Sequence, residues 1–209
     1  CTFCVEGRPT YSRVKSFHID RVQAELRYMA ERVNGVNELT IADSNFGMNK
    51  WDLATAEAIA GVQSEFQWPT LVNASTGKNR QERVIETVAV LNGAWVAGSA
   101  VQSSDSDVLD NVKRSNISLD AYSDLMDSMN SLGKDALTYS EIILGLPGDT
   151  KDKHFDSLRY AVDSQVNRVH MYEATLLTGT DMDSQETRDK FGLVTKFRLI
   201  PGGVGSYEF

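Results

Sequence analysis

Two cysteines stand at the start of the chain, where they could hold a metal. Cys1 and Cys4 form a Cys-x-x-Cys pair, and the 209 residues contain no other cysteine. Two thiolates at this spacing can bind one metal ion or cluster, because the turn between them points both sulfurs the same way. The pair suits half of a zinc site, a redox dithiol, or two ligands of an iron–sulfur cluster. A zinc site would need further ligands, such as His18, and the plain alternative is a pair of buried cysteines without a chemical role.

Polar side chains follow several apolar, strand-like runs further along the chain. Asp43 and Ser44 end the first run, and Gln102 and Ser103 end the third. A carboxylate such as that of Asp43 accepts hydrogen bonds from an ammonium group, although it can equally cap the next turn. Short polar segments after strands are also common simply because such loops are exposed. The pattern therefore nominates these positions without assigning them a role.

An arginine and a glycine-rich turn add two further candidates. Arg114 lies on the helix predicted after Gln102, where its planar fork could bind a carboxylate or could simply be a solvated surface group. The segment Gly145-Leu146-Pro147-Gly148-Asp149 follows the fourth strand-like run. Its glycines allow the backbone to approach a flat ligand, although any tight strand-to-helix turn has this composition. It lacks the GxxxxGK[ST] pattern of a phosphate-binding loop.

The elements that must position these residues alternate regularly along the chain. Apolar side chains recur at spacings of three and four between the strand-like runs, which predicts amphipathic helices. In the segment 151–165, with Thr150 as its expected cap, the apolar face is formed by Phe155, Leu158, Ala161 and Val162. The predicted strands are 38–42, 70–74, 95–101, 140–146 and 168–174. Strand and helix in alternation predict a parallel α/β sheet, open or closed into a barrel, with ligands at the carboxyl ends of the strands.

Composition excludes several classes of protein. Lys and Arg total 21 against 29 Asp and Glu, a net charge of −8, which argues against binding to duplex nucleic acid. No apolar run approaches the roughly 18 residues of a membrane span, and no signal peptide is visible. Two cysteines are too few for a disulfide-rich scaffold. Since the first residue is Cys1 rather than Met, we interpret the sequence as part of a longer protein.

Taken in order, these motifs resemble the core of the radical S-adenosylmethionine (radical SAM) superfamily. The chain has Cys-x-Phe-Cys at its start, then QSxDxxVLxxxxR from Gln102 to Arg114, then EIILGLPGDT, and then a strand leading to Gly-Thr. The family motif is CxxxCxxC, with an aromatic residue just before its last cysteine. Cys1 and Cys4 match the second and third cysteines, so the first would lie four residues before Cys1. The resemblance extends from Cys1 to about Met182.

The resemblance implies a redox cofactor and a reaction type. In this family three thiolates hold a [4Fe–4S] cluster, S-adenosylmethionine binds its open iron, and reductive cleavage gives a 5′-deoxyadenosyl radical. That radical serves hydrogen abstraction or methyl transfer, here on an unknown small-molecule substrate. The most similar members carry a separate cobalamin-binding domain, which implies cobalamin held outside this chain. A cellular electron donor such as flavodoxin or ferredoxin and a cytoplasmic location are also implied, since a reducing compartment preserves free thiols.

The resemblance also implies site residues. Asp43 and Ser44 match positions near the methionine amino group, although the family's usual GGE pattern is absent. Gln102 and Ser103 match positions near the ribose and methionine, and Arg114 matches an arginine that pairs with the methionine carboxylate in some relatives. Positions on the adenine side are matched by Ile143, Gly145, Leu146, Met171 and Tyr172. Cys1 and Cys4 are the implied cluster ligands.

The implied fold is a partial (β/α)6 TIM-like barrel, of which this chain supplies the second to sixth strands and lacks the first. Residues 1–186 would form the radical SAM core, and residues 187–209 would begin a C-terminal extension. The alternative from another class is a non-catalytic α/β metal- or ligand-binding module, in which the Cys-x-x-Cys pair holds zinc or nothing.

Overall fold

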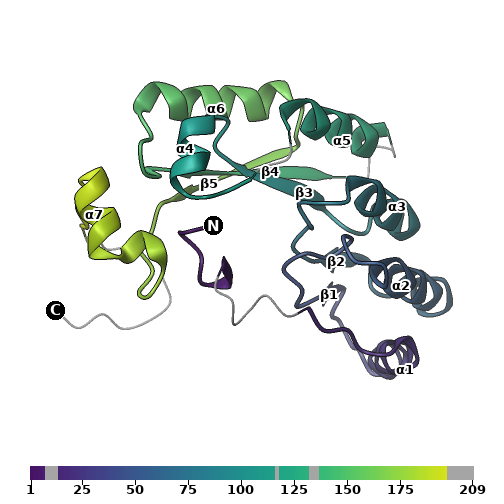
Figure 1. The fold of residues 1–209 in the computed structure, drawn as a ribbon. Helices are drawn as coiled ribbons and strands as arrows, with labels where there is room; N and C mark the ends of the chain where they lie inside the picture. The colour runs from purple at the N-terminus through teal and green to yellow at the C-terminus, as the bar shows by residue number, and fades with distance from the viewer. Residues whose placement is uncertain (8–13, 116–117, 132–136, 197–209) are drawn as a thin grey trace.

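The scaffold is a row of parallel strands with helices along one side (Figure 1). The computed structural model describes residues 1–7, 14–115, 118–131 and 137–196. The strands are, in chain order, β1 (Glu38–Thr40), β2 (Leu71–Asn73), β3 (Ala97–Gln102), β4 (Thr138–Leu144) and β5 (Arg168–Glu173). All five predicted strands are therefore confirmed, although β1, β2 and β5 are shorter than predicted, β3 runs over 97–102 rather than 95–101, and β4 over 138–144 rather than 140–146.

Two sheets make up the row, and one bridge connects them. β1 pairs with β2, while β3, β4 and β5 form the second sheet in that order, and every pair is parallel. Val72 of β2 bridges to Trp95, just before β3, and its amide donates to the Ala94 carbonyl at 2.7 Å. Among the described residues β1 and β5 stand at the two ends and do not pair. The α/β class with parallel strands, and an arc rather than a closed barrel, are as predicted.

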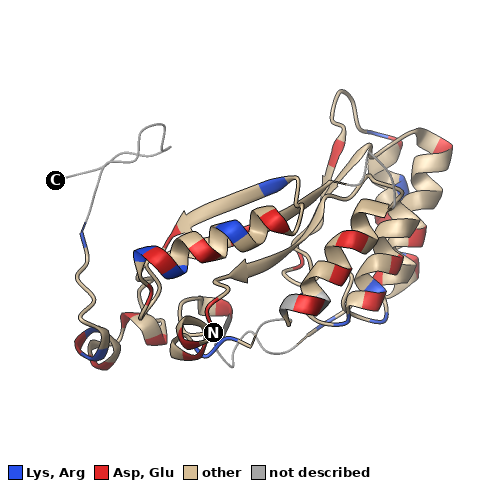
Figure 2. Cartoon of the chain, turned by 90° about the horizontal axis from the view of Figure 1, so that it is seen from above, with Lys and Arg blue, Asp and Glu red and all other residues tan. Residues whose placement is uncertain are grey.

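The longer helices cover the outer side of the sheets, and shorter elements lie near the carboxyl ends of the strands (Figure 1). The long helices are α1 (Ile19–Ala30), α2 (Asp52–Phe66), α3 (Gln81–Leu91), α5 (Leu119–Ser131) and α6 (Lys151–Asp163). The short elements are η1 (Val5–Gly7), α4 (Ser106–Asn111), η3 (Asp181–Asp183) and α7 (Gln185–Phe191). Figure 2 shows acidic residues along the outer helices, interspersed with basic ones. In the part of the chain that the structure describes, no helix is both long and apolar enough to cross a bilayer.

The main core lies between the strands and the outer helices. Trp95 is its largest fully buried side chain, and its ring meets that of Phe46 edge-on at 5.0 Å between centroids. The Trp95 indole also donates to the Ala74 carbonyl at 3.2 Å, so that its one polar atom is satisfied. Apolar faces of α2, α3 and α5 complete this core, with side chains that include Ile59, Val84, Val88, Leu91, Tyr122, Met126 and Met129.

Local capping explains where two helices near the strand ends begin. The Thr150 hydroxyl accepts from the Lys153 amide at 3.3 Å, which confirms the predicted cap of α6. The Asp105 carboxylate accepts from the Val108 amide at 3.0 Å and so begins α4. Asp105 also binds the Lys153 ammonium at 2.8 Å, which ties α4 to α6 and lowers the pKa of the carboxyl.

The apolar face predicted for α6 is partly wrong. Phe155 and Val162 are 52% and 65% exposed, whereas Ala161 is buried. The helix instead turns Ser157 inward, where its hydroxyl accepts from the Ser104 amide at 2.9 Å. This hydrogen bond to the loop after β3 takes the place of an apolar contact, and Phe155 lies in an open groove with Met171 of β5.

The close approach of β3 to β4 depends on one glycine, and this predicts a sharp difference between two substitutions. An added Cβ at Gly98 would overlap the Tyr139 carbonyl oxygen and ring. We expect Gly98→Ala to lower the free energy of unfolding by about 1–3 kcal/mol or more through overpacking. Urea unfolding followed by circular dichroism measures the change.

Gly61 provides the matched control. It lies within α2, and an added Cβ there would meet nothing within 4 Å. Gly61→Ala should therefore stabilise the protein by roughly 0.5–1 kcal/mol, since alanine is the better helix former. Equal effects of the two substitutions would contradict the packing of β3 against β4.

Candidate functional site

A cavity of about 510 Å³ opens where the N-terminal segment faces the sheets, and we call it the strand-end cavity. Six stretches of the chain contribute to its wall: the N-terminal segment, the loop after β1, the loop after β2, the end of β3, Arg114 after α4, and the first half of β4. Its lining residues are Cys1, Phe3, Cys4, Glu6, Ser44, Asn45, Ser75, Thr76, Lys78, Ala100, Gln102, Arg114, Tyr139 and Glu141. Segments far apart in sequence therefore meet at one site.

Backbone hydrogen bonds hold the cysteine segment in place. The Thr2 amide donates to the Val112 carbonyl at 2.9 Å, and the Thr2 carbonyl accepts from the Met182 amide at 2.9 Å. Thr2 is buried, and the Phe3 side chain packs against a second apolar cluster that contains Val112, Leu146 and Met182. The aromatic residue of the motif thus anchors the turn that carries both sulfurs.

Both sulfurs line the cavity. Cys1 is exposed and Cys4 is half-buried, and both are free thiols. The Arg114 guanidinium lies 3.6 Å from the Cys1 sulfur, and the Glu6 amide donates to the Cys4 sulfur at 3.4 Å. Donors around a sulfur stabilise its thiolate form, which is the form that binds metals.

Arg114 was expected on the helix after Gln102, but α4 ends at Asn111 and Arg114 lies in the segment that follows, from which its side chain reaches the end of β3. Its guanidinium donates to the Ala100 carbonyl, which fixes its position at the rim. Burial lowers the pKa of Arg114, while the charges of Glu141 and Cys4 act in the opposite direction. Burial likewise raises the pKa of Glu141, and the charges of His170 and Arg114 oppose that shift. The cavity therefore holds charged groups that are partly removed from water.

Gln102 has the geometry of a ligand contact. Its backbone is left-handed, with φ of 66°, and its side chain is 6% exposed. The Oε1 atom has no hydrogen-bond donor among the described residues. Buried polar atoms are almost always satisfied, so this acceptor beside the cavity has room to accept from a water or from a bound molecule.

The structure brings five of the predicted site residues into the strand-end cavity: Cys1, Cys4, Ser44, Gln102 and Arg114. Asp43 lines a neighbouring cavity, and its carboxylate accepts from the Asn45 amide at 2.8 Å. Ser103 is buried and faces Ser157, with 3.4 Å between the hydroxyl oxygens.

The adenine-side candidates lie outside this cavity. Leu146 is buried in the second apolar cluster, with Ile143 packed beside it. Gly145 has φ of 84°, and its amide donates to the Asp149 carboxylate at 3.2 Å. Met171 lies in an apolar groove that it shares with Phe155 of α6. The roles of these residues stay predictions.

A second cavity of about 410 Å³, the sheet-face cavity, adjoins the first. Ser75, Tyr139 and Glu141 line both cavities. His170 and Tyr172 line the sheet-face cavity, and their rings stack with 6.3 Å between centroids. Tyr139 and Glu141 were not among the predicted site residues, although their spacing of two on β4 is the signal that places both on one face.

The two cysteine side chains fit part of the ligand set of a metal centre. Among the described residues no three His, Cys, Asp or Glu side chains come together in a group that could hold a metal ion. The two thiolates at the rim are soft ligands of the kind that iron–sulfur clusters require. They therefore fit two of the ligand positions of such a cluster. The Gln102 side chain, whose Oε1 has no described donor, and the Arg114 guanidinium line the same cavity as the two cysteines.

Comparison with curated proteins finds relatives of one kind, although no protein-family profile matches the chain. The cobalamin-dependent radical SAM methyltransferase TokK from Streptomyces tokunonensis is 31% identical over 199 residues. The 2-(S-pantetheinyl)-carbapenam-3-carboxylate methyltransferase from Streptantibioticus cattleyicolor is 30% identical over 199 residues. Each match covers 93% of this chain and 29% of the relative, so the chain spans less than a third of their length.

Solved structures share the fold at low sequence identity. The radical SAM methyltransferase TsrM from Kitasatospora setae, solved with cobalamin and a [4Fe–4S] cluster bound, aligns with a TM-score of 0.72 at 15% identity, covering 87% of this chain and 36% of TsrM. The radical SAM enzyme HemN, the coproporphyrinogen III oxidase of Escherichia coli, aligns with a TM-score of 0.57 at 16% identity, covering 76% of this chain and 37% of HemN. The predicted resemblance is therefore confirmed: over nearly its whole length the chain is similar to two methyltransferases, one of them a cobalamin-dependent radical SAM enzyme, and it has the fold of a radical SAM domain.

Proposed function

We propose that the chain is the cluster- and S-adenosylmethionine-binding core of an enzyme that transfers a methyl group with the help of cobalamin. One observation carries the proposal: both cysteine sulfurs, Gln102 and Arg114 converge on a single cavity near the carboxyl ends of parallel strands. Fold and relatives alone would support the class but not the residues. The cobalamin would be held by a part of the protein outside these 209 residues.

The cysteine turn is the proposed cluster ligand. Cys1 and Cys4 would bind two irons, and a third thiolate must come from beyond the two cysteines of this chain. When bound, the reduced cluster supplies the electron that cleaves S-adenosylmethionine to a 5′-deoxyadenosyl radical. The Thr2 hydrogen bonds hold the turn rigid, and Arg114 beside Cys1 favours the thiolate that binds iron.

The other residues would bind and orient S-adenosylmethionine. The orphaned Gln102 oxygen can accept from a ribose hydroxyl, and the Arg114 fork can bind the methionine carboxylate. Ser44, with Asp43 behind it, would face the amino group. Adenine would lie along Ile143, Gly145 and Leu146, with Met171, Tyr172 and Ser103 as further proposed contacts.

The setting of the reaction is also proposed. The acceptor is a small molecule of unknown identity, and a flavodoxin or ferredoxin would supply electrons. We place the reaction in the cytoplasm, because a reducing compartment keeps thiols free for the cluster. We further propose that residues 1–186 form the core and that residues 187–209 begin an extension, of which 197–209 lie outside the described residues.

Iron loading tests the cluster assignment. Anaerobic reconstitution of the full-length protein with iron and sulfide should give about four irons per chain and a brown colour. Cys1→Ala and Cys4→Ala should each lose the cluster, because each removes a thiolate ligand. Iron analysis and visible absorption measure the outcome.

Three results of iron loading, two with the full-length protein and one with the 209-residue chain, would oppose the proposal. Retained iron in both cysteine variants would show that the cluster lies elsewhere. Zinc without iron after reconstitution would favour a non-catalytic binding module. Full iron loading by the 209-residue chain alone would contradict the need for a third thiolate.

Arg114 gives a second test that leaves the cluster intact. Arg114→Lys keeps the charge but loses the planar fork, so S-adenosylmethionine should bind about tenfold more weakly, as expected for a lost charged hydrogen bond. Calorimetry on the reconstituted enzyme measures the affinity, with iron content unchanged. Arg159→Lys on the exposed face of α6 is the matched control and should bind as tightly as wild type. Equal affinity in all three proteins would remove Arg114 from the site.

A further inference from the structure

Lys78 stands on a loop that is built to hold its position. The loop follows β2 and is attached to the loop after β1, because Thr76 forms a parallel bridge with Phe46 and the Gly77 amide donates to the Phe46 carbonyl at 2.9 Å. Gly77 is packed so closely that an added Cβ would lie 2.9 Å from the Asn45 carbonyl oxygen. The Lys78 carbonyl also accepts from the Gln81 side chain at 2.8 Å. The root of the Lys78 side chain is therefore fixed.

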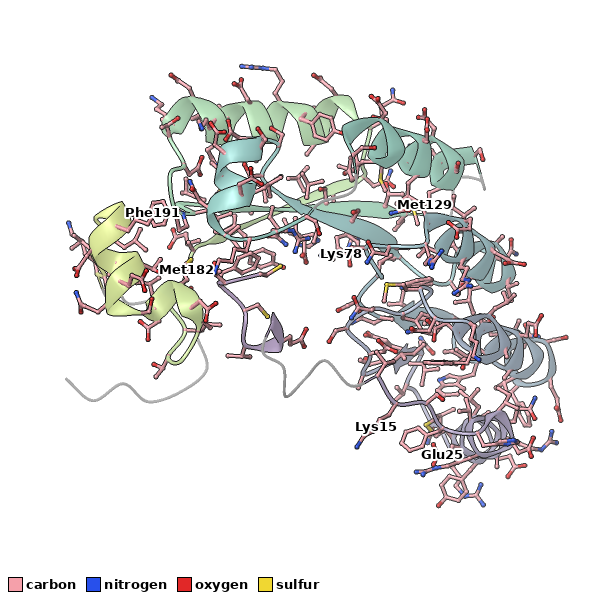
Figure 3. The ribbon with its side chains drawn as sticks, in the orientation of Figure 1. Lys15, Glu25, Lys78, Met129, Met182 and Phe191 are labelled. Carbon is pink, nitrogen blue, oxygen red and sulfur yellow. The ribbon has the colours of Figure 1, made fainter. Side chains whose placement is uncertain are left out.

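The side chain extends across the strand-end cavity. Its ammonium donates to the Ser115 carbonyl at 3.3 Å, next in sequence to Arg114. Figure 3 shows Lys78 on the side of the sheets where the N-terminal segment lies, opposite α6. Lys78 and Arg114 thus bring two positive charges to one cavity, from two different parts of the chain.

Two cations, Lys78 and Arg114, and two carboxylates, Glu6 and Glu141, line the cavity, but neither carboxylate pairs with Lys78 in the described part of the chain. Glu141 acts on the Arg114 charge, and the Glu6 carboxylate accepts from the Ser44 hydroxyl at 2.8 Å. Within the described part of the chain no ion pair joins Lys78 to a carboxylate. Burial, and then the neighbouring Arg114 charge, lower the pKa of Lys78. A partly buried cation without a counter-ion is costly, and an anion from a ligand would remove that cost.

We propose that Lys78 binds a carboxylate group of the molecule that occupies the strand-end cavity. The inference rests on the proposed function only for the identity of that molecule. The carboxylate has two possible sources, the methionine end of S-adenosylmethionine and the acceptor substrate. In either case Lys78 is a binding residue that selects for an anion, and the ammonium contributes a charged hydrogen bond.

Nuclear magnetic resonance tests the carboxylate site on the 209-residue chain without any cofactor. In protein labelled with ¹³C at lysine Cε, the signal absent from Lys78→Met belongs to Lys78. Sodium acetate, as the bare carboxylate, should shift this signal saturably at constant ionic strength. The signal of Lys50, which is exposed after β1 and is assigned with Lys50→Met, should not saturate. An unresponsive Lys78 signal overturns the proposal.

Calorimetry on the reconstituted full-length enzyme then identifies the source. If the carboxylate is that of S-adenosylmethionine, Lys78→Met binds it about tenfold more weakly. Binding of S-adenosyl-methioninamine, which lacks the carboxylate, is then unchanged, and Lys78→Arg restores most of the affinity. Unchanged S-adenosylmethionine affinity with a retained acetate response assigns the site to the acceptor. Wild type that responds to acetate but binds no S-adenosylmethionine would defeat the proposed function and leave the carboxylate site standing.

Discussion

The backbone clamp on Thr2 is the constraint on which the site depends. Its hydrogen bonds to Val112 and Met182 fix the backbone between the two cysteines and so give the two sulfurs their direction. The clamp works because Phe3 supplies an apolar side chain to the cluster of Val108, Val112, Leu146 and Met182. The same cluster holds the turn after β4, so the cysteine segment and the glycine-rich turn are positioned by one small core.

Charged side chains line the strand-end cavity, which the cysteine segment borders. A protein with a net charge of −8 gathers Arg114 and Lys78 in one cavity, which runs against its overall balance. Glu6 and Glu141 line the same cavity, and Lys78, which forms no ion pair with a described carboxylate, can attract a small anion without making the surface attractive to nucleic acid. Glu141 sits between this cavity and the sheet-face cavity, with Arg114 on one side and His170 on the other. A ligand spanning both spaces would meet cations first and then a carboxylate with aromatic rings.

The sequence predicted the order of elements because helix and strand periods are local properties of the chain. The rule that ligands gather at strand ends nominated Ser44 and Gln102, and the structure places both in one cavity with Arg114 and the cysteines. It could not separate Gln102 from Ser103, because the left-handed backbone at Gln102 sends the next hydroxyl toward α6. It also missed Glu141, whose position depends on which face of β4 turns inward. Phe155 was placed wrongly because a hydrogen bond of Ser157, invisible in the periodicity, decided the buried face of α6.

The central claim is that the cysteine sulfurs hold a cluster with one open iron facing this cavity. Electron–nuclear double resonance on the reduced full-length protein tests it most directly, with S-adenosylmethionine labelled with ¹⁵N in its amino group. The account predicts a hyperfine coupling between the cluster spin and that nitrogen, which disappears in Cys4→Ala. A cluster signal without nitrogen coupling in the presence of saturating S-adenosylmethionine would contradict it.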